Sequence, residues 1–179
     1  LCTAFCIGRR NMNALEQYRL ELKTLPLGEH EFNFVLDDEY FKAIGSEEIT
    51  KGDVNATITV TKTAHNITLD IDLLGEVTTT CDRCLDPLKI DIDAVETLYI
   101  SFGDTYQEES DDQITIPEDE EYFDISWILY EYVVLSLPLK KVHEEGECNP
   151  EMIKILHQHE GTIADTKTTE ENKVDPRWA

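Results

Sequence analysis

"DVNATITVTKTAHNITLDIDLLG", residues 53–75, holds two segments in which apolar and polar residues alternate, separated by a short polar turn. Side chains along a strand point alternately to opposite faces, so each segment has one apolar and one polar face. The apolar positions are Val54, Ala56, Ile58, Val60, Ile67, Leu69, Ile71 and Leu73. Two such strands joined by a short turn predict an antiparallel hairpin with one buried face.

The alternation continues on both sides of this hairpin. Residues 18–25 and 29–36 alternate before it, and in the second of these Phe32, Phe34 and Leu36 share one face. After it, residues 88–103 alternate with a change of phase between Ala94 and Glu96, where we expect a β-bulge. The sequence therefore predicts a meander-like antiparallel sheet.

Three segments show helical patterns instead. Residues 37–45 predict a short helix between an N-cap at Asp37 or Asp38 and a stop at Gly45. "DISWILYEYVVLSLPLKK", residues 124–141, predicts a helix that Asp124 caps and that ends before Pro138, and residues 150–159 predict another. The expected fold class is α+β, with the antiparallel sheet covered by one or two helices.

The length of 179 residues suits a single domain with loose ends. We expect this α+β domain to span residues 12–160, with Met12 as the natural start. Residues 1–11 are expected to be a non-native or disordered extension, and residues 161–179 a flexible tail. Neither lysine nor arginine occurs from Ile90 to Leu139, so we expect residues 104–122 to form an acidic loop. That loop is interpreted either as a disordered insert or as a docking strip for a basic partner.

The formal net charge of −23 argues against nucleic acid as the default partner. Proteins gain affinity for phosphates by placing lysine and arginine against them, which this acidic protein cannot do over most of its surface. A basic protein would be attracted, although acidity can also serve solubility alone. No apolar run approaches the roughly 20 residues that cross a bilayer, so we expect no membrane span.

The C-x-x-C pair in "TTTCDRCLDPL", residues 78–88, is the main chemical signature of the sequence. Zinc needs four ligands at tetrahedral corners, and a C-x-x-C turn supplies two thiolates. His143 and Cys148, with Gly146 to bend the chain between them, could complete a Cys3His set. We therefore expect Cys81, Cys84, His143 and Cys148 to form a structural zinc site, despite the long separation between the two pairs.

Two other interpretations of the cysteine pair stay open at this point. The cysteines could be buried or free thiols, or they could form a redox pair. A redox pair favours the N-terminus of a helix, whereas Pro87 and the alternating residues after it favour a strand. We find no nucleophile elbow, phosphate loop or framed carboxylate pair, so an enzyme is disfavoured.

Four short segments together resemble the YceD family, the large ribosomal RNA subunit accumulation proteins. They are "CDRCL" at Cys81–Leu85, "EYVVLSLP" at Glu131–Pro138, "HEEGEC" ending at Cys148, and "VDPRW" at Val174–Trp178. The resemblance covers about residues 13–179. It implies a cytoplasmic ribosome-assembly factor without assigned catalytic activity. Family members often have cysteine where this sequence has His143, so the Cys3His set departs from a four-cysteine version while staying competent for zinc.

The leading hypothesis is that an acidic surface binds a basic ribosomal protein or another ribosome-assembly factor, with ribosomal RNA affected only indirectly. The candidate partner-binding residues are Arg83, Lys140, Lys141 and Glu131. The Glu131 carboxylate interrupts the apolar run of its helix, and it either faces solvent or accepts a buried hydrogen bond. One alternative is a zinc module that binds RNA directly through Arg83, Lys89, Lys140 and Lys141. Another is a thiol oxidoreductase that uses the C-x-x-C pair.

Overall fold

The computed structural model describes residues 14–159 except 65 and 111. The predictions for residues 1–11 and 161–179 lie outside this range, as does the proposed start at Met12. The described elements are η1 Glu16–Tyr18, β1 Arg19–Leu20, β2 Gly28–Leu36, α1 Asp38–Ile44, β3 Lys51–Lys62, β4 Ile67–Thr80, β5 Pro87–Gly103, β6 Gln107–Ser110, β7 Gln113–Pro117, β8 Phe123–Asp124, α2 Ser126–Ser136 and α3 Pro150–His159.

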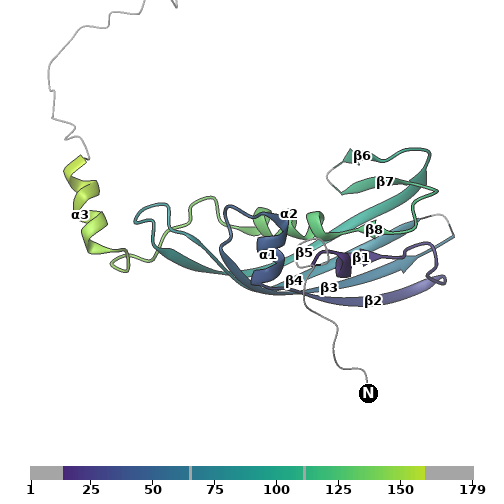
Figure 1. The fold of residues 1–179 in the computed structure, drawn as a ribbon, viewed down its shortest axis with the longest axis horizontal. Coiled ribbons are helices and arrows are strands. Elements are labelled where there is room, and N and C mark those ends of the chain that lie inside the picture. The colour runs from purple at the N-terminus through teal and green to yellow at the C-terminus, as the bar shows by residue number, and fades with distance from the viewer. Residues whose placement is uncertain (1–13, 65, 111, 160–179) are drawn as a thin grey trace, which may run out of the picture.

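A curved six-stranded sheet in the order β2-β3-β4-β5-β7-β6 forms the body of the protein (Figure 1). From β2 to β5 it is an antiparallel meander, as predicted. The register of the central hairpin places Ile58 opposite Ile71 and Val60 opposite Leu69. All the apolar positions named for residues 53–75 are at most 1 % exposed, so the predicted buried face is confirmed.

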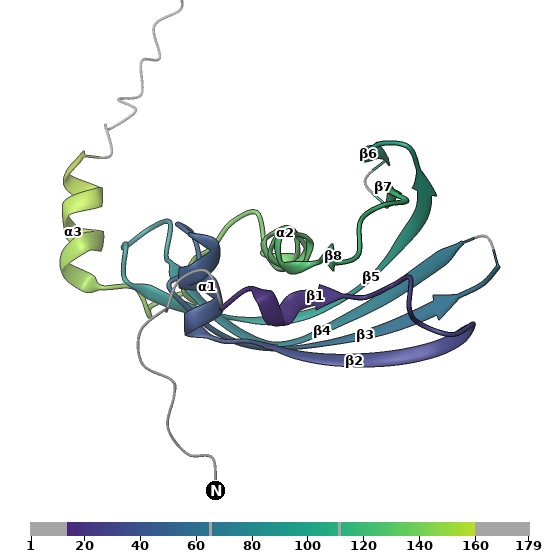
Figure 2. The same cartoon turned by 45° about the vertical axis from the view of Figure 1, so that its right-hand side comes forward.

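The inner face of the sheet is covered by α2, which lies in the concave side of the curved strands (Figure 2). Ile125, Leu129 and Val133 are all 0 % exposed and form the contact stripe. The helix ends before Pro138, as predicted, but Ile125 rather than Asp124 occupies the N-cap position. Asp124 still contributes, because its carboxylate accepts a hydrogen bond of 3.0 Å from the backbone N–H of Ser126. The α+β fold class is confirmed.

The two smaller helices also form where the sequence predicts them. Asp37 caps α1 by accepting the N–H of Tyr40 at 2.9 Å, and Gly45 ends the helix with a left-handed φ of 80°. The second small helix, α3, stands beyond the end of the sheet that lies away from β6 and β7 (Figure 1). None of the helices in the described residues is long and apolar enough to cross a membrane.

The strand predicted over residues 18–25 is largely wrong. Only Arg19–Leu20 forms a strand, and it pairs with β8 outside the main sheet. The alternating apolar residues there are nevertheless buried, since Tyr18, Leu20 and Leu22 are at most 2 % exposed. Burial of alternate side chains gives the same sequence pattern with or without a long ladder of backbone hydrogen bonds.

The bulge predicted near residues 94–96 is also wrong. The register between β4 and β5 runs without a shift through Leu73 opposite Ala94 and Ile71 opposite Glu96. Only the pattern of apolar and polar side chains changes here. Val95 is apolar but points to the outer face, where it is 68 % exposed, and Glu96 occupies a position of the inner face but is also exposed. The apolar pattern breaks here because solvent reaches both faces, whereas the backbone pairing stays regular.

The acidic loop predicted over residues 104–122 contains two strands, so that prediction is wrong for this part of the chain. β7 pairs in parallel with β5, with Ile100 opposite Ile114 and Phe102 opposite Ile116. Ile114 and Ile116 are 6 % and 3 % exposed, whereas every residue of β6 is exposed. Two buried isoleucines thus hold an acidic segment on the sheet, while its carboxylates remain in water.

Lys62 ties the segment before β2 to the end of β3. Its Nζ donates to the carbonyl oxygens of Leu22, Lys23 and Leu25 at 2.9, 2.7 and 2.9 Å. We expect Lys62→Met to lower the free energy of unfolding by about 1–3 kcal/mol, because hydrogen bonds to a charged donor are lost and carbonyls are left unpaired. Urea unfolding measures this, with exposed Lys51 in the same strand mutated to Met as the control. Equal effects of the two substitutions would contradict the prediction.

Candidate metal centre

The C-x-x-C pair lies in the loop that joins β4 to β5. The loop is closed by two backbone hydrogen bonds of 2.9 Å, from Cys81 N–H to Asp86 O and from Leu85 N–H to Cys81 O. Leu85 adopts a left-handed φ of 64°, which reverses the chain within a few residues. Cys81 and Cys84 are 0 % and 1 % exposed, so both thiols lie in the interior of this small loop.

His143 and Cys148 come from the segment between α2 and α3. Gly146 has a φ of 93°, a region that favours glycine, and Glu147 N–H bonds to Glu144 O at 3.1 Å. Gly146 therefore bends the chain between the two ligands, as the sequence predicts. Cys148 is 8 % exposed, and His143 is half-buried.

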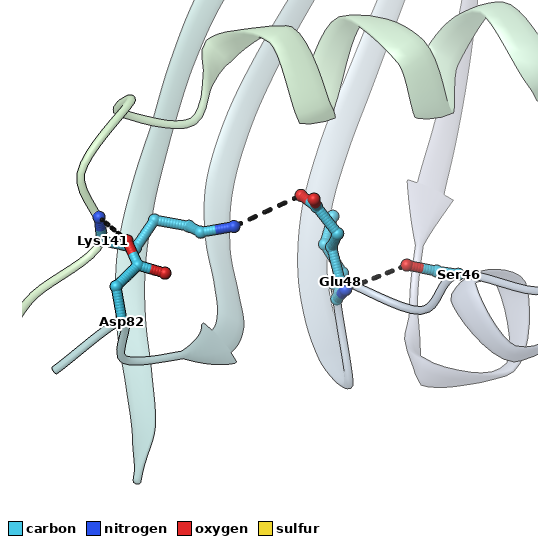
Figure 3. Close-up of polar contacts among 5 residues, drawn as sticks. Ser46, Glu48, Asp82 and Lys141 are labelled. Atoms are coloured by element: carbon cyan, nitrogen blue, oxygen red, sulfur yellow. Dashed lines mark hydrogen bonds and ion pairs between the residues drawn. The ribbon is translucent and has the colours of Figure 1, made fainter. Parts of the chain in front are cut away.

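Asp82 joins the two loops through paired hydrogen bonds with Lys141. The N–H of Asp82 donates to Lys141 O at 2.7 Å, and the N–H of Lys141 donates to the Asp82 carboxylate at 2.7 Å (Figure 3). A further bond of 3.1 Å runs from Asn149 Nδ2 to the carboxylate of Asp86. These contacts bring residues 81–86 against residues 141–149 through the polypeptide alone.

The predicted ligands converge. One ligand atom from each of Cys81, Cys84, His143 and Cys148 lies within 4.8 Å of all the others, so these residues could hold a metal ion. His143 Nδ1 lies 3.4 Å from Cys84 Sγ and 4.0 Å from Cys148 Sγ. A tetrahedral zinc ion with bonds of about 2.0–2.3 Å spaces its ligand atoms about 3.5–3.8 Å apart, so the donor set fits.

The imidazole of His143 is oriented by a backbone carbonyl. Its Nε2 lies 3.1 Å from the carbonyl oxygen of Pro87. A carbonyl can only accept, so Nε2 carries the proton and the lone pair of Nδ1 faces the sulfurs. Histidine ligands of metals are commonly fixed in this way, and sequence reasoning could not have identified Pro87 as the partner.

The surroundings of Cys81 favour a thiolate. Burial by itself would raise its pKa, but the backbone N–H groups of Cys84, Arg83 and His143 point at the sulfur and lower the pKa to about 6. The hydrogen bond to Cys81 raises the pKa of His143, and burial raises that of Cys148. Arg83 adds positive charge, with its Nη1 3.9 Å from Cys148 Sγ. Metal ligation requires deprotonated thiols, which these donors stabilise.

The interpretation as a redox pair lacks the structural context that it needs. The cysteine pair lies between two β-strands rather than at a helix N-terminus. A third thiol and an imidazole also lie within the same cluster, and they have no part in a two-cysteine redox cycle. The arrangement favours metal binding over thiol chemistry.

The predicted partner-binding residues do not form one patch. Arg83, Lys140 and Lys141 lie at the end of the molecule that contains the candidate metal centre. The Lys141 ammonium lies 3.4 Å from the carboxylate of Glu48 (Figure 3). Glu48 lies in the loop between α1 and β3, where the Ser46 hydroxyl accepts a hydrogen bond from the N–H of Ile49. Glu131 lies on α2, where its exposed carboxylate accepts the indole N–H of Trp127 at 2.7 Å. The solvent-facing interpretation of Glu131 is thereby confirmed.

The sequence over residues 69–179 matches the profile of a family described as "Large ribosomal RNA subunit accumulation protein YceD". This range is more than half of the chain and includes all four candidate ligands. The chain belongs to the YceD family. It also contains "VDPRW", residues 174–178, which lies outside the described structure. No match was found among curated proteins or among solved structures.

The matched range covers only some of the described elements. It begins within β4 and takes in β5, α2, α3 and both pairs of candidate metal ligands, but not β2, α1 or β3. The parts that carry the candidate metal centre and the acidic strands therefore lie within the family's shared region. The family description names accumulation of an RNA and no chemical reaction.

Proposed function

We propose that this YceD protein is a non-enzymatic, cytoplasmic ribosome-biogenesis factor that supports accumulation of large-subunit ribosomal RNA. The family match carries this proposal, because the family description names that role. The absence of a catalytic motif in the sequence is consistent with it. The protein acts as a binding module rather than as an enzyme.

The metal in this proposal is a structural zinc ion. Three thiolates and one imidazole match the softness and tetrahedral geometry that zinc prefers. Since the protein supplies all four ligands, a tetrahedral ion has no open position for water or substrate. The ion joins the β4–β5 loop to the segment before α3, and thus supports the shape of this end of the molecule.

An acidic surface that binds a basic ribosomal protein or assembly factor explains how this protein affects ribosomal RNA without contacting the RNA itself. The net charge of −23 repels polyanions and attracts basic proteins. Three of the four basic residues considered for direct RNA binding are already engaged. Arg83 faces Cys148, Lys89 bonds to Glu76 at 2.6 Å, and Lys141 pairs with Glu48. These contacts weaken the alternative of a basic RNA-binding patch.

Affinity capture of the tagged full chain from a lysate of its source cells tests the proposal. We expect large-subunit ribosomal proteins or assembly factors, identified by mass spectrometry, to be recovered after ribonuclease treatment. Their recovery should fall steeply between about 50 mM and about 300 mM salt, because screening weakens contacts between exposed charges.

Gel-shift experiments with large-subunit ribosomal RNA fragments provide the counter-test. We expect no shift with the wild-type protein at about 150 mM salt, because a polyanion gains nothing from an acidic surface. A shift that disappears in a Lys140→Ala variant would replace the proposal with the direct RNA-binding alternative. Failure to capture any ribosomal protein or assembly factor at low salt would refute it.

A further inference from the structure

A groove lies between α2 and the strands β6 and β7, at the opposite end of the sheet from the metal centre. It encloses about 580 Å³. Its apolar lining includes Leu98 of β5 and Ile114 and Ile116 of β7, all nearly buried. In Figure 2, β6 and β7 rise beside α2, and residues of both strands line the groove. We call this space the acidic groove.

Three exposed aromatic side chains gather around the acidic groove. Tyr106, Tyr122 and Trp127 line it and are 51 %, 46 % and 53 % exposed. Large exposed aromatic residues that cluster around a depression are typical of protein-binding surfaces, because each ring adds contact area at a low cost in side-chain entropy. The groove therefore offers rings that the fold itself leaves uncovered.

Three carboxylates from three parts of the chain face the same space. Glu108 lies on β6, Glu120 precedes β8, and Glu131 lies on α2. Burial raises the pKa of Tyr106 to about 12, aided by its 2.9 Å hydrogen bond to Glu108 and by the charges of Glu108, Glu131 and Glu120. The three acids and this hydroxyl all line the same groove.

No basic residue balances these acids in the described part of the chain. None of the residues that line the groove is lysine, arginine or histidine. The one lining carboxylate with an ion-pair partner is Asp124, which lies 3.6 Å from Arg19. Glu108, Glu120 and Glu131 form no ion pair among residues 14–159 outside the two omitted positions. The groove is a concentrated negative site with aromatic walls.

We propose that the acidic groove binds an extended, arginine-containing segment of a basic partner protein. The inference rests on the proposed function and assigns its docking site. An arginine side chain stacks on Trp127 or Tyr106 while its guanidinium bonds to Glu131 and Glu108. Arginine is favoured over lysine because its planar, weakly hydrated guanidinium stacks on rings and bonds two acceptors at once. RNA and anionic lipids are excluded by the sign of the charge.

Trp127 allows binding to be followed directly. The chain contains two tryptophans, so Trp178→Phe leaves Trp127 as the sole indole. We expect a hexa-arginine peptide to change the fluorescence of this full-length variant in a saturable way. Hexa-lysine, which has the same charge, should bind at least about threefold more weakly. Binding of both peptides should weaken as salt is raised.

A matched pair of double variants locates the site. Glu108→Gln with Glu131→Gln removes two charges from the groove, whereas Asp72→Asn with Asp93→Asn removes two from exposed positions on the outer face of the sheet. By calorimetry, we expect the groove variant to weaken hexa-arginine binding about tenfold and the outer-face variant to change it less than about twofold.

Three outcomes overturn the inference. Equal weakening in both double variants would show attraction to diffuse charge rather than to the groove. Equal affinity for hexa-lysine would remove the role of the aromatic rings, and absence of peptide binding would remove the site. Capture of ribosomal proteins from lysate is a separate readout. If capture succeeds and peptide binding fails, the proposed function stands without this docking site. If peptide binding succeeds and capture fails, the groove stands without that function.

Discussion

Replacing Cys148 with alanine is expected to reduce the zinc content of the purified protein from one ion per chain to none. The substitution removes a nearly buried sulfur that lies 4.0 Å from His143 Nδ1 and leaves three of the four ligands. Losing one thiolate lowers the affinity enough for a mild chelator to remove the ion during dialysis. Elemental analysis of protein purified without added zinc measures the change.

Two cysteines outside the described residues supply the control. A Cys2→Ser, Cys6→Ser double variant removes two thiols that are not among the four candidate ligands. We expect it to keep a full complement of zinc. A parent protein without metal, or a Cys148→Ala protein that retains it after dialysis, would contradict the assignment.

The consequence of zinc loss should be confined to one end of the molecule. Buried Cys81, Cys84 and Cys148 form a small cluster with Met152 and Ile153, separate from the main core. No residue of α3 is itself buried, so this cluster is its principal anchor. Hydrogen exchange should accelerate in α3 and the loop before it, while β3 and β4 stay protected. Exchange that accelerates equally in β3 would contradict this local role.

The central hairpin and α2 were predictable because their signals are local. The alternation from Val54 to Leu73 and the apolar spacing of Ile125 and Leu129 depend only on which face of each element is buried. Asp37 and Gly45 fix α1 in the same way, since a cap acts within a few residues of its own position.

The errors arise where distant residues decide the structure. Two isoleucines in an acidic segment do not reveal that β7 pairs in parallel with β5. The two strands are neighbours in the sheet although β6 lies between them in the sequence. The break in the apolar pattern near Ala94 likewise comes from the exposure of Val95 and Glu96 and not from a bulge. Neither property is visible in a window of neighbouring residues.

The ligands of the candidate metal centre were predicted from residue type, but the groups that hold those ligands in position were not. Cysteine and histidine are recognisable as metal ligands from residue type alone, so the sequence was enough to predict Cys81, Cys84, His143 and Cys148. The carbonyl of Pro87 that orients the imidazole belongs to the backbone, which every residue carries. The acidic groove was missed for a related reason, because its walls come from separate elements that only the folded chain brings together.

Leu129→Ala is expected to lower the free energy of unfolding by about 2–5 kcal/mol, the range for deleting a fully buried leucine side chain. Leu129 is 0 % exposed at the centre of the stripe that α2 presents to the sheet. The residues around it are held in place by the strands below, so a cavity would remain. Such a loss is a large share of the roughly 5–15 kcal/mol that stabilises a typical domain.

Leu135 gives a matched control on the same helix, because it is 76 % exposed and undergoes the same chemical change. Leu135→Ala should shift the unfolding free energy by less than about 0.5 kcal/mol. Urea unfolding followed by far-ultraviolet circular dichroism measures both variants. The 2.6 Å hydrogen bond from the Tyr40 hydroxyl to Ser126 O holds only the start of α2, so it cannot replace packing at Leu129. Similar losses in the two variants would show that α2 does not form the cover on which the inner face of the sheet depends.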